Sequence, residues 1–183
     1  MQLNSTAILG VISIIPEQHS DGRGHFTETF RAEWFPDRAF IQDNASYSER
    51  PWTLRGLHYQ VPPRDQVKLV RVARGRIRDV AVDLRVGSPT FLEHITVDLS
   101  ADGGEQLLVP GEFAHGYLTL EPDTVVLYKT TSYYSPDHER IIPWNDPTVA
   151  VDWGLAVDPV VSDRDRNGPA FKPTESPFVF RSP

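Results

Sequence analysis

Short runs of apolar and β-branched residues recur along this chain, and each ends at glycine, proline, aspartate or serine. The clearest run covers 79–86, where every second residue is aliphatic, the period of a β-strand. One face of that strand would carry Val80, Val82, Leu84 and Val86, and the other Asp79, Ala81, Asp83 and Arg85. Similar runs lie at 7–15, 67–72, 94–99, 106–109, 117–120 and 125–131, with a turn expected at 73–76. Many short strands at this spacing favour an all-β sandwich or barrel.

Helix signals are scarce in comparison. Only the stretch 28–38 has a helical pattern, and Pro36 interrupts it. The 183 residues fit one domain, and no repeat or linker divides them. We expect a single domain over 1–183 whose last segment, 167–183 with four prolines, is an extended tail packed along the body or a neighbouring subunit.

Charge and composition limit the ligands and reactions that are open to this chain. The net charge of −7 argues against a broad nucleic-acid surface, because such a surface needs excess positive charge. A local group of cations can still bind one phosphorylated ligand, and Arg23, Arg55, Lys68 and Arg71 are candidates. The chain has no cysteine, which excludes disulfides and thiolate chemistry. No apolar run is long enough to cross a membrane and no signal-like segment begins the chain, so we expect no membrane partner and a cytoplasmic location.

Lys68 has two possible orientations. It shares a strand face with Val70 and Val72, so its ammonium group would point inward if those valines do. In the opposite orientation Val67 and Leu69 would form the core and Lys68 would be solvated. Periodicity alone slightly favours the solvated orientation.

Two histidines lie in sequences that suit a binding site. His58 precedes a Tyr-Gln pair and a proline break, and His115 precedes a glycine that allows close backbone approach. Either could instead be a structural hydrogen-bonding histidine. The His-x-His pair of metal-binding cupin barrels is missing, because Tyr59 and Gln60 follow His58, and we therefore expect no metal cofactor.

Asp165 and Tyr128 are further candidates for proton chemistry. Asp163 and Asp165 fit an exposed acidic turn, but a carboxylate there could also orient a histidine, as in a catalytic triad. Tyr128, Tyr133 and Tyr134 fit ordinary strand aromatics, and one of them could donate a proton.

Nine motifs occur in an order that resembles one family over almost the whole chain. They are D-G-R-G-H-F-T-E-T-F from Asp21, Q-D-N from Gln42, L-R-G-L-H-Y-Q from Leu54, Q-V-K-L-V-R from Gln66, D-V-A-V-D-L-R from Asp79, S-P-T-F from Ser88, F-A-H-G from Phe113, Y-K-T-T from Tyr128 and W-N-D-P from Trp144. The chain thus resembles the dTDP-4-dehydrorhamnose 3,5-epimerases, an all-β cupin (jelly-roll) family acting on nucleotide-linked 4-keto-6-deoxy sugars.

The resemblance implies a role for each matching residue. His58 matches the general base, Asp165 its carboxylate partner, Tyr128 the general acid, and Lys68 the cation beside the keto oxygen of the sugar. Phe26 and Tyr134 match positions that stack on the thymine base. The remaining substrate-binding positions are Arg23, Glu28, Gln42, Asp43, Asn44, Arg55, His115, Glu139 and Arg164. The family resemblance, with the exposed sheet edges expected here, also points to a homodimer.

These residue types suit epimerisation beside a ketone. A C4 carbonyl acidifies the C–H bonds at C3 and C5, so a base on one face and an acid on the other can invert each carbon without a cofactor. The substrate implied is dTDP-4-keto-6-deoxy-glucose, and the product is dTDP-4-keto-L-rhamnose. Arginine contacts to the pyrophosphate and stacking of the base would supply most of the affinity.

Other functions remain open from the sequence. The same residues would serve a C5-only or C3-only epimerase of a deoxysugar pathway, and a 3,4-ketoisomerase would share the barrel and substrate class. A non-catalytic sugar-nucleotide-binding cupin would be expected to lack part of the acid–base set. Departures from the family pattern occur at 110–113, at 142–144 and in the longer segment between Asn44 and Arg55, and we expect them near the cleft mouth.

Overall fold

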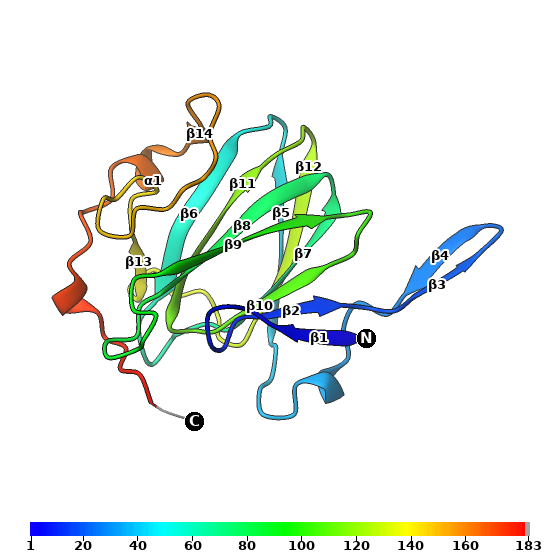
Figure 1. Cartoon of the computed structure of the whole chain (residues 1–183), viewed down its shortest axis with the longest axis horizontal. Helices are drawn as coiled ribbons and strands as arrows, with labels where there is room; N and C mark the ends of the chain where they lie inside the picture. Colours follow the sequence, from blue (N-terminus) through cyan, green and yellow to red (C-terminus); the bar gives the residue numbers. More distant parts are fainter. Residues whose placement is uncertain (182–183) are drawn as a thin grey trace.

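The computed structural model describes residues 1–181 and arranges most of their strands in two six-stranded sheets that face each other (Figure 1). In order across it, the first sheet contains β1 (Gln2–Ser5), β2 (Ile12–Ile15), β10 (Gln106–Val109), β7 (Lys68–Arg74), β12 (Thr124–Thr130) and β5 (Gln42–Ser48). The second sheet contains β13 (Glu139–Ile141), β6 (Thr53–Gln60), β11 (Phe113–Thr119), β8 (Arg76–Asp83) and β9 (His94–Ser100), and β14 (Val160–Val161) pairs with β6 in parallel. The prediction of an all-β fold is confirmed.

The chain crosses from one sheet to the other at Gly75. β7 ends at Arg74 in the first sheet and β8 begins at Arg76 in the second, so one residue makes the predicted turn. Gly75 has φ of 80°, and a side chain there would overlap Thr124. Glycine therefore allows two strands that follow each other in sequence to face each other across the interior.

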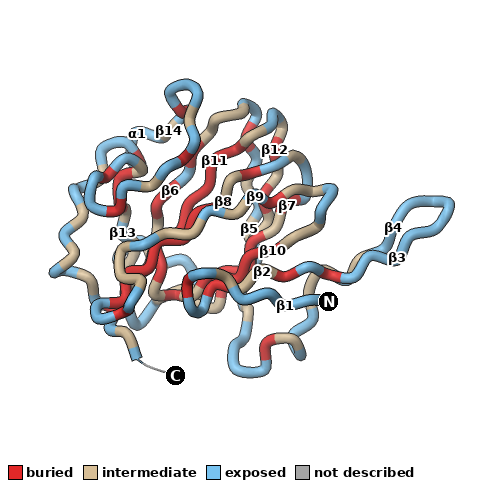
Figure 2. Tube along the Cα trace, viewed as in Figure 1, coloured by how far each residue is buried: buried red, intermediate tan, exposed pale blue. Residues whose placement is uncertain are grey.

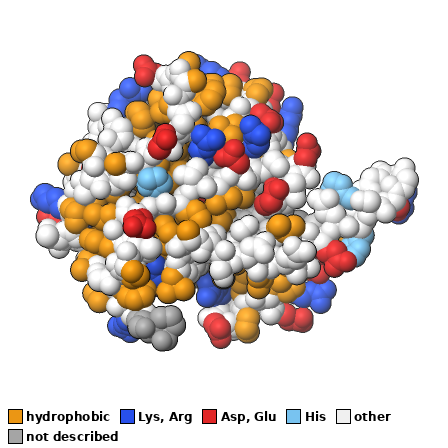
Figure 3. Space-filling model, viewed as in Figure 1, with side chains coloured by type: hydrophobic (Ala, Val, Ile, Leu, Met, Phe, Trp, Pro, Cys, Tyr) orange, Lys and Arg blue, Asp and Glu red, His pale blue; other side chains and the backbone are white. Residues whose placement is uncertain are grey.

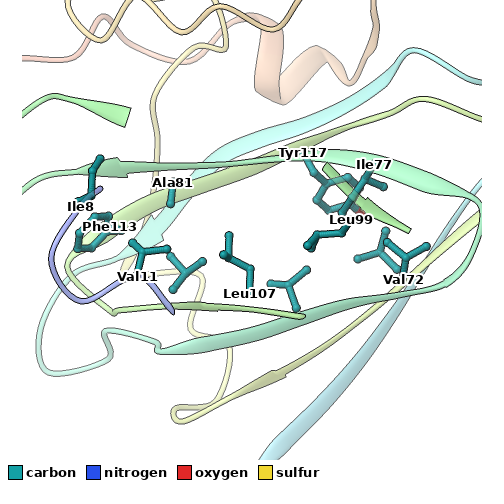
Figure 4. Close-up of a cluster of buried hydrophobic side chains, with 12 residues drawn as sticks. Ile8, Val11, Val72, Ile77, Ala81, Leu99, Leu107, Phe113 and Tyr117 are labelled. Atoms are coloured by element: carbon teal, nitrogen blue, oxygen red, sulfur yellow. The ribbon is translucent and has the colours of Figure 1, made fainter. Parts of the chain in front are cut away.

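The main core fills the space between the sheets (Figure 4). It consists of Ile8, Val11, Val70, Val72, Ile77, Ala81, Leu99, Leu107, Val109, Phe113, Tyr117 and Val126. Burying each larger aliphatic side chain contributes about 1.5–3 kcal/mol. Val70 and Val72 point inward, so Lys68 on the same strand face does too, and only 9% of it is exposed. The inward orientation is the one the structure adopts.

Both sheets are also covered on part of their outer faces. Consecutive residues of β11 are therefore buried, as Figure 2 shows. Val80 and Val82 of β8 pack beneath Ile142, Trp153 and Phe178, so the alternating strand is buried on both faces. Leu69, next to Lys68, packs under Phe35. Covering from both sides explains why alternation alone does not distinguish inside from outside in these strands.

The prediction of a helix over 28–38 is wrong. Only the 3-10 turn η1 (Ala32–Trp34) forms there. Phe30, Phe35 and Phe40 pack together instead, with ring centroids 5.3 to 6.2 Å apart. Residues five apart on an α-helix point in directions about 140° apart, so a helix would separate these rings.

The C-terminal segment from β14 to residue 181 lies along the body. It contains β14, the four-residue helix α1 (Asp163–Arg166) and the 3-10 turn η2 (Pro173–Glu175). Phe178 is buried against Tyr59, and Val179 bridges to Val86. The last two residues of the predicted tail, 182–183, lie outside the described residues.

A hairpin of β3 (Gln18–Asp21) and β4 (Gly24–Thr27) projects away from both sheets (Figures 1 and 3). Nearly all of its residues are exposed, and 70% of the surface of Phe26 is exposed. Across residues 1–181, no helix has the length and apolar character needed to cross a membrane.

Candidate active site

A cavity of about 530 Å³ lies between the two sheets. Inward-facing positions of strands in both sheets supply many of its polar side chains, and the rest come from segments next to the strands and from helix α1. Its lining includes Ser46, Arg55, His58, Gln60, Gln66, Lys68, His115, Tyr117, Tyr128, Tyr134, Glu139, Arg164 and Asp165. Eleven of the fifteen residues assigned to the site from the sequence lie at or beside this cavity. Nine line it: His58, Lys68, Tyr128, Asp165, Arg55, His115, Tyr134, Glu139 and Arg164. Asn44 and Gln42 lie beside it, hydrogen-bonded to the lining residues Tyr128 and Tyr134.

His58 and Asp165 form a hydrogen-bonded pair although they are 107 residues apart. His58 Nε2 lies 2.6 Å from Asp165 Oδ1, and the Gly56 amide donates to Oδ2 at 3.3 Å. Ser162 caps helix α1 by accepting from the Asp165 amide at 3.1 Å, which fixes the backbone of Asp165. The side chain of His58 is 29% exposed and that of Asp165 only 6%.

The environment of Asp165 keeps its carboxylate ionised. Burial acts to raise the pKa of Asp165, but the hydrogen bonds from His58 and the Gly56 amide outweigh burial and lower the pKa below its usual value. An ionised acceptor at Nε2 places the proton of neutral His58 on that atom and leaves Nδ1 free to accept another. With this arrangement His58 can accept a proton at Nδ1 while Asp165 holds the ring in place.

Lys68 reaches across the interior from the first sheet. Its Nζ donates to the main-chain oxygen of His58 at 3.2 Å. Burial lowers the pKa of Lys68 to about 8, and the charges of Asp79 and Glu139 oppose this change. The ammonium group is therefore still mainly charged at pH 7, and it can stabilise negative charge that forms in the cavity.

Tyr128 faces the cavity from β12. The Asn44 side-chain amide donates to the Tyr128 carbonyl oxygen at 3.3 Å, across the β5–β12 pairing. Burial raises the pKa of Tyr128, so the phenol keeps its proton at neutral pH. It is an available proton donor on the sheet opposite His58.

A second histidine–carboxylate pair lies deeper in the cavity. His115 Nε2 is 2.9 and 3.0 Å from the two carboxylate oxygens of Asp79, and both residues are buried. Burial lowers the pKa of His115, against the opposing effect of Asp79. Asp79 is a site residue that the sequence analysis does not single out. Its position could have indicated it, because Asp79 shares a strand face with Ile77 and Ala81, which are core residues.

Two more polar residues were missed. Tyr117 hydrogen-bonds Ser46 across the sheets, and burial raises the pKa of Tyr117 to about 12. Nothing in the sequence distinguished these hydroxyls from ordinary strand residues.

The cavity mouth carries a charged cluster. Arg164 pairs with Glu139, and the Tyr134 hydroxyl donates to Glu139 at 2.9 Å. Arg55 donates to the Tyr47 carbonyl oxygen at 3.0 Å, and Gln42 donates to Asn44 at 2.7 Å. Cations and amides thus surround the opening.

Four predicted substrate-binding residues do not reach the cavity of their own chain. Arg23 and Phe26 lie on the projecting hairpin, where Arg23 pairs with Asp21, and Glu28 pairs with Arg31. Asp43 points to the outer face of β5 and pairs with Lys129 at 2.7 Å. The departures at 110–113 and 142–144 do not line the cavity, so the expectation that they lie at its mouth is wrong, whereas Ser46 and Thr53 of the segment between Asn44 and Arg55 do line it. Phe113 and Ile142 are core residues instead.

Within residues 1–181, no group of three or more histidine, aspartate or glutamate side chains is arranged to hold a metal ion.

Sequence and structure comparisons agree on one family. The family model described as dTDP-4-dehydrorhamnose 3,5-epimerase matches residues 5–173. A dTDP-4-dehydrorhamnose 3,5-epimerase from Sinorhizobium fredii is 44% identical, over 99% of this chain and 94% of that protein.

Solved structures of such enzymes have the same fold, which confirms the predicted cupin class. The dTDP-4-dehydrorhamnose 3,5-epimerase of Bacillus anthracis, with TDP and PPi bound, has a TM-score of 0.89 and 42% identity, over 93% of this chain and 99% of that one. The dTDP-6-deoxy-D-glucose-3,5-epimerase of Legionella pneumophila, in complex with dTDP-4-keto-L-rhamnose, has a TM-score of 0.85 and 40% identity, over 90% and 89%. A 3'-monoepimerase of Streptomyces bikiniensis, in complex with dTDP-quinovose, has a TM-score of 0.84 and 34% identity, over 90% and 85%.

Proposed function

This chain belongs to the dTDP-4-dehydrorhamnose 3,5-epimerase family, and we propose that it inverts C3 and C5 of dTDP-4-keto-6-deoxy-glucose to give dTDP-4-keto-L-rhamnose. The observation that carries this proposal is the placement of His58 with Asp165 on one side of the cavity and Tyr128 on the other, with Lys68 between the sheets. Relatives whose names specify this reaction, and a similar structure holding dTDP-4-keto-L-rhamnose, support it.

Each inversion is a proton abstraction followed by protonation from the other face. His58 Nδ1 takes the proton from the carbon beside the ketone, and the electron pair of that C–H bond moves into the carbonyl group to form an enolate. Asp165 stabilises the resulting imidazolium. The enolate oxygen carries the new negative charge, and the ammonium group of Lys68 stabilises it.

Tyr128 completes the step by protonating the same carbon from the opposite side, which reverses its configuration. The resulting phenolate takes a proton from solvent, and His58 returns its proton to solvent, so both groups are reset. Because the ketone itself holds the electron pair, the reaction needs neither cofactor nor metal. The same carbonyl group also acidifies the C–H bond on the other side of C4, so the same groups serve both inversions.

The nucleotide binds at the cavity mouth in this proposal. Arg55 and Arg164 would contact the substrate there, Tyr134 would stack on the thymine base, and His115 would contact the substrate from deeper in the cavity. Gln42, Asn44 and Glu139 provide hydrogen-bonding groups beside them. Binding through this unreactive part would hold the sugar between the base and the acid.

A homodimer would bring the projecting hairpin to a second copy of the site. Arg23 and Phe26 cannot serve the cavity of their own chain from the hairpin, and the exposure of Phe26 leaves its ring free to contact a neighbour. The hairpin of one subunit would then supply Arg23 and Phe26 to the partner, together with Glu28 just after the hairpin and Asp43 on the outer face of β5. The cytoplasmic location remains a prediction from the sequence.

A single-site epimerase is the second candidate, because the chain is also similar to a 3'-monoepimerase. Nuclear magnetic resonance of the product formed in deuterated water separates the two. The 3,5-epimerase gives deuterium and inverted configuration at both C3 and C5, whereas inversion at one carbon supports the single-site enzyme. Binding of dTDP without exchange at either carbon would contradict both.

A further inference from the structure

Three glutamine side chains hold four consecutive residues at the cavity mouth. Gln66 donates to the Ser132 carbonyl oxygen at 2.8 Å, and Gln60 donates to that of Tyr133 at 3.3 Å. In the other direction, the Tyr134 amide donates to Gln42 Oε1 at 3.0 Å, and the Ser135 amide donates to Gln60 Oε1 at 2.7 Å. We call the segment 132–135 the mouth segment.

The glutamines come from both sides of the interior. Gln42 begins β5 in the first sheet, Gln60 ends β6 in the second, and Gln66 precedes β7. The mouth segment itself follows β12, the strand of Tyr128, and leads toward β13, the strand of Glu139. Its backbone is therefore tied to both sheets by side chains.

Gln60 is the central member of this set. It is only 3% exposed, and its amide nitrogen also donates to the Arg64 carbonyl oxygen at 2.5 Å. A buried amide is costly unless both its oxygen and nitrogen are hydrogen-bonded, and here both are. A hydrophobic residue of similar size would fill the same space and leave the mouth segment without these bonds.

The side chains of Tyr133 and Tyr134 are exposed although the backbone of the mouth segment is held. Tyr134 is 49% exposed, yet its ring lines the cavity and its hydroxyl is bonded to Glu139. An exposed aromatic ring on a fixed backbone is already ordered before a planar ligand arrives, so binding loses less conformational freedom.

We infer that Gln60 and Gln66 are positioning residues for nucleotide binding, which act by holding the mouth segment so that Tyr134 is in place for the base. The inference rests on the proposed function, since it takes dTDP as the ligand. Neither glutamine touches the reacting carbons in this account, so their loss acts on affinity more than on the chemical step.

The test compares Gln66→Met and Gln60→Met with wild type by calorimetric titration with dTDP and by steady-state kinetics. Each variant is expected to raise the Kd for dTDP and the KM by about fivefold or more, with kcat changed by less than about twofold. Ser176→Ala is the control, because it removes a side-chain bond to the Leu84 carbonyl oxygen outside the cavity and should leave the Kd unchanged. A Kd within about twofold of wild type in both glutamine variants overturns the inference.

A double-mutant cycle separates positioning from a general structural role. In the Tyr134→Ala background, Gln66→Met should change the Kd by less than about twofold, because the ring that it positions is gone. An undiminished effect of Gln66→Met in that background overturns the inference.

Hydrogen exchange of the wild-type protein tests the same point without a variant. The amides of Tyr134 and Ser135 are expected to exchange slowly, and exchange at the rate of an unprotected amide overturns the inference. Wild-type protein that does not bind dTDP would overturn the proposed function itself, whereas dTDP binding with unaffected glutamine variants would overturn this inference alone.

Discussion

The ammonium group of Lys68 donates a 3.2 Å hydrogen bond to the main-chain oxygen of His58, and so joins a strand of the first sheet to a strand of the second. The bond places a buried cation beside the residue proposed as base. Tyr128 is also on the first sheet, on β12 beside β7. The proposed chemistry therefore depends on how the two sheets face each other.

Asp165→Asn should lower kcat by about 10³-fold or more, because an amide can donate to His58 and favour the wrong tautomer. The Kd for dTDP should stay close to that of wild type. Steady-state kinetics and dTDP titration measure the two effects. A variant that keeps most of its kcat would remove Asp165 as the orienting carboxylate.

Tyr128→Phe should lose epimerised product while the proton beside the ketone still exchanges with solvent. The phenyl ring fills the same space but carries no donor, so His58 can remove a proton and return it to the same face. Deuterium in recovered, uninverted substrate is the expected observation. Normal formation of the epimer by this variant would mean that another group is the acid.

Activity should fall as the pH rises through about 8, where Lys68 loses its charge. The enolate is then no longer stabilised by a cation. Lys68→Arg keeps a charge at every accessible pH, so the alkaline fall in kcat/KM should move upward in that variant even if the rate is lower. An alkaline limb at the same pH in both proteins would show that Lys68 is not the group that titrates.

Lys68→Met should stabilise the fold at pH 7. The pKa of Lys68 is about 8 in the folded protein and 10.5 ordinarily, so the folded state binds the proton more weakly. Below about pH 8 the whole of this difference lowers the free energy of unfolding. The penalty decreases as the pH rises from about 8 toward 10.5, where the unfolded chain also loses the proton.

The lowered pKa of Lys68 reduces the free energy of unfolding by about 3 kcal/mol, since each pKa unit corresponds to about 1.36 kcal/mol. Loss of the bond to His58 offsets about 1 kcal/mol, which leaves about 2 kcal/mol in favour of the variant. Urea unfolding at pH 7 and pH 10 measures both values, and the advantage should shrink at the higher pH. A less stable variant at pH 7 would contradict the assignment of Lys68 as a buried charge.

Mixed dimers test the role of the hairpin. Arg23→Ala and His58→Ala should each be nearly inactive as homodimers. If the hairpin serves the partner, a mixed dimer has one site with both changes and one site with neither, so activity returns on mixing under exchange conditions. No recovery, with mixed dimers present, would mean that Arg23 does not act across subunits.

Much of the fold could be read from local pattern. The strands at 94–99, 106–109 and 125–131 are confirmed within a residue, because short apolar runs bounded by turn residues are typical of strands. The helix expected at 28–38 could not be excluded locally, since the packing of Phe30, Phe35 and Phe40 against the sheet decides its shape.

Local sequence pattern predicts less of the site than of the fold. Periodicity slightly favours a solvated Lys68, because both faces of its strand are covered and alternation does not distinguish them. The packing of Val70 and Val72 between the sheets is what turns Lys68 inward. Asp165 reaches His58 because β14 pairs with β6 and carries helix α1 beside it, a contact that sequence distance does not reveal. The family resemblance, and not the sequence pattern, predicts a role in the site for Lys68 and Asp165.

The measurement that tests the central claim most directly is solvent exchange by His58→Ala in deuterated water with dTDP-4-keto-6-deoxy-glucose. The account predicts no deuterium at C3 or C5 above the uncatalysed level, while dTDP binds with an affinity close to that of wild type. Exchange at the wild-type rate by this correctly folded variant would contradict His58 as the base.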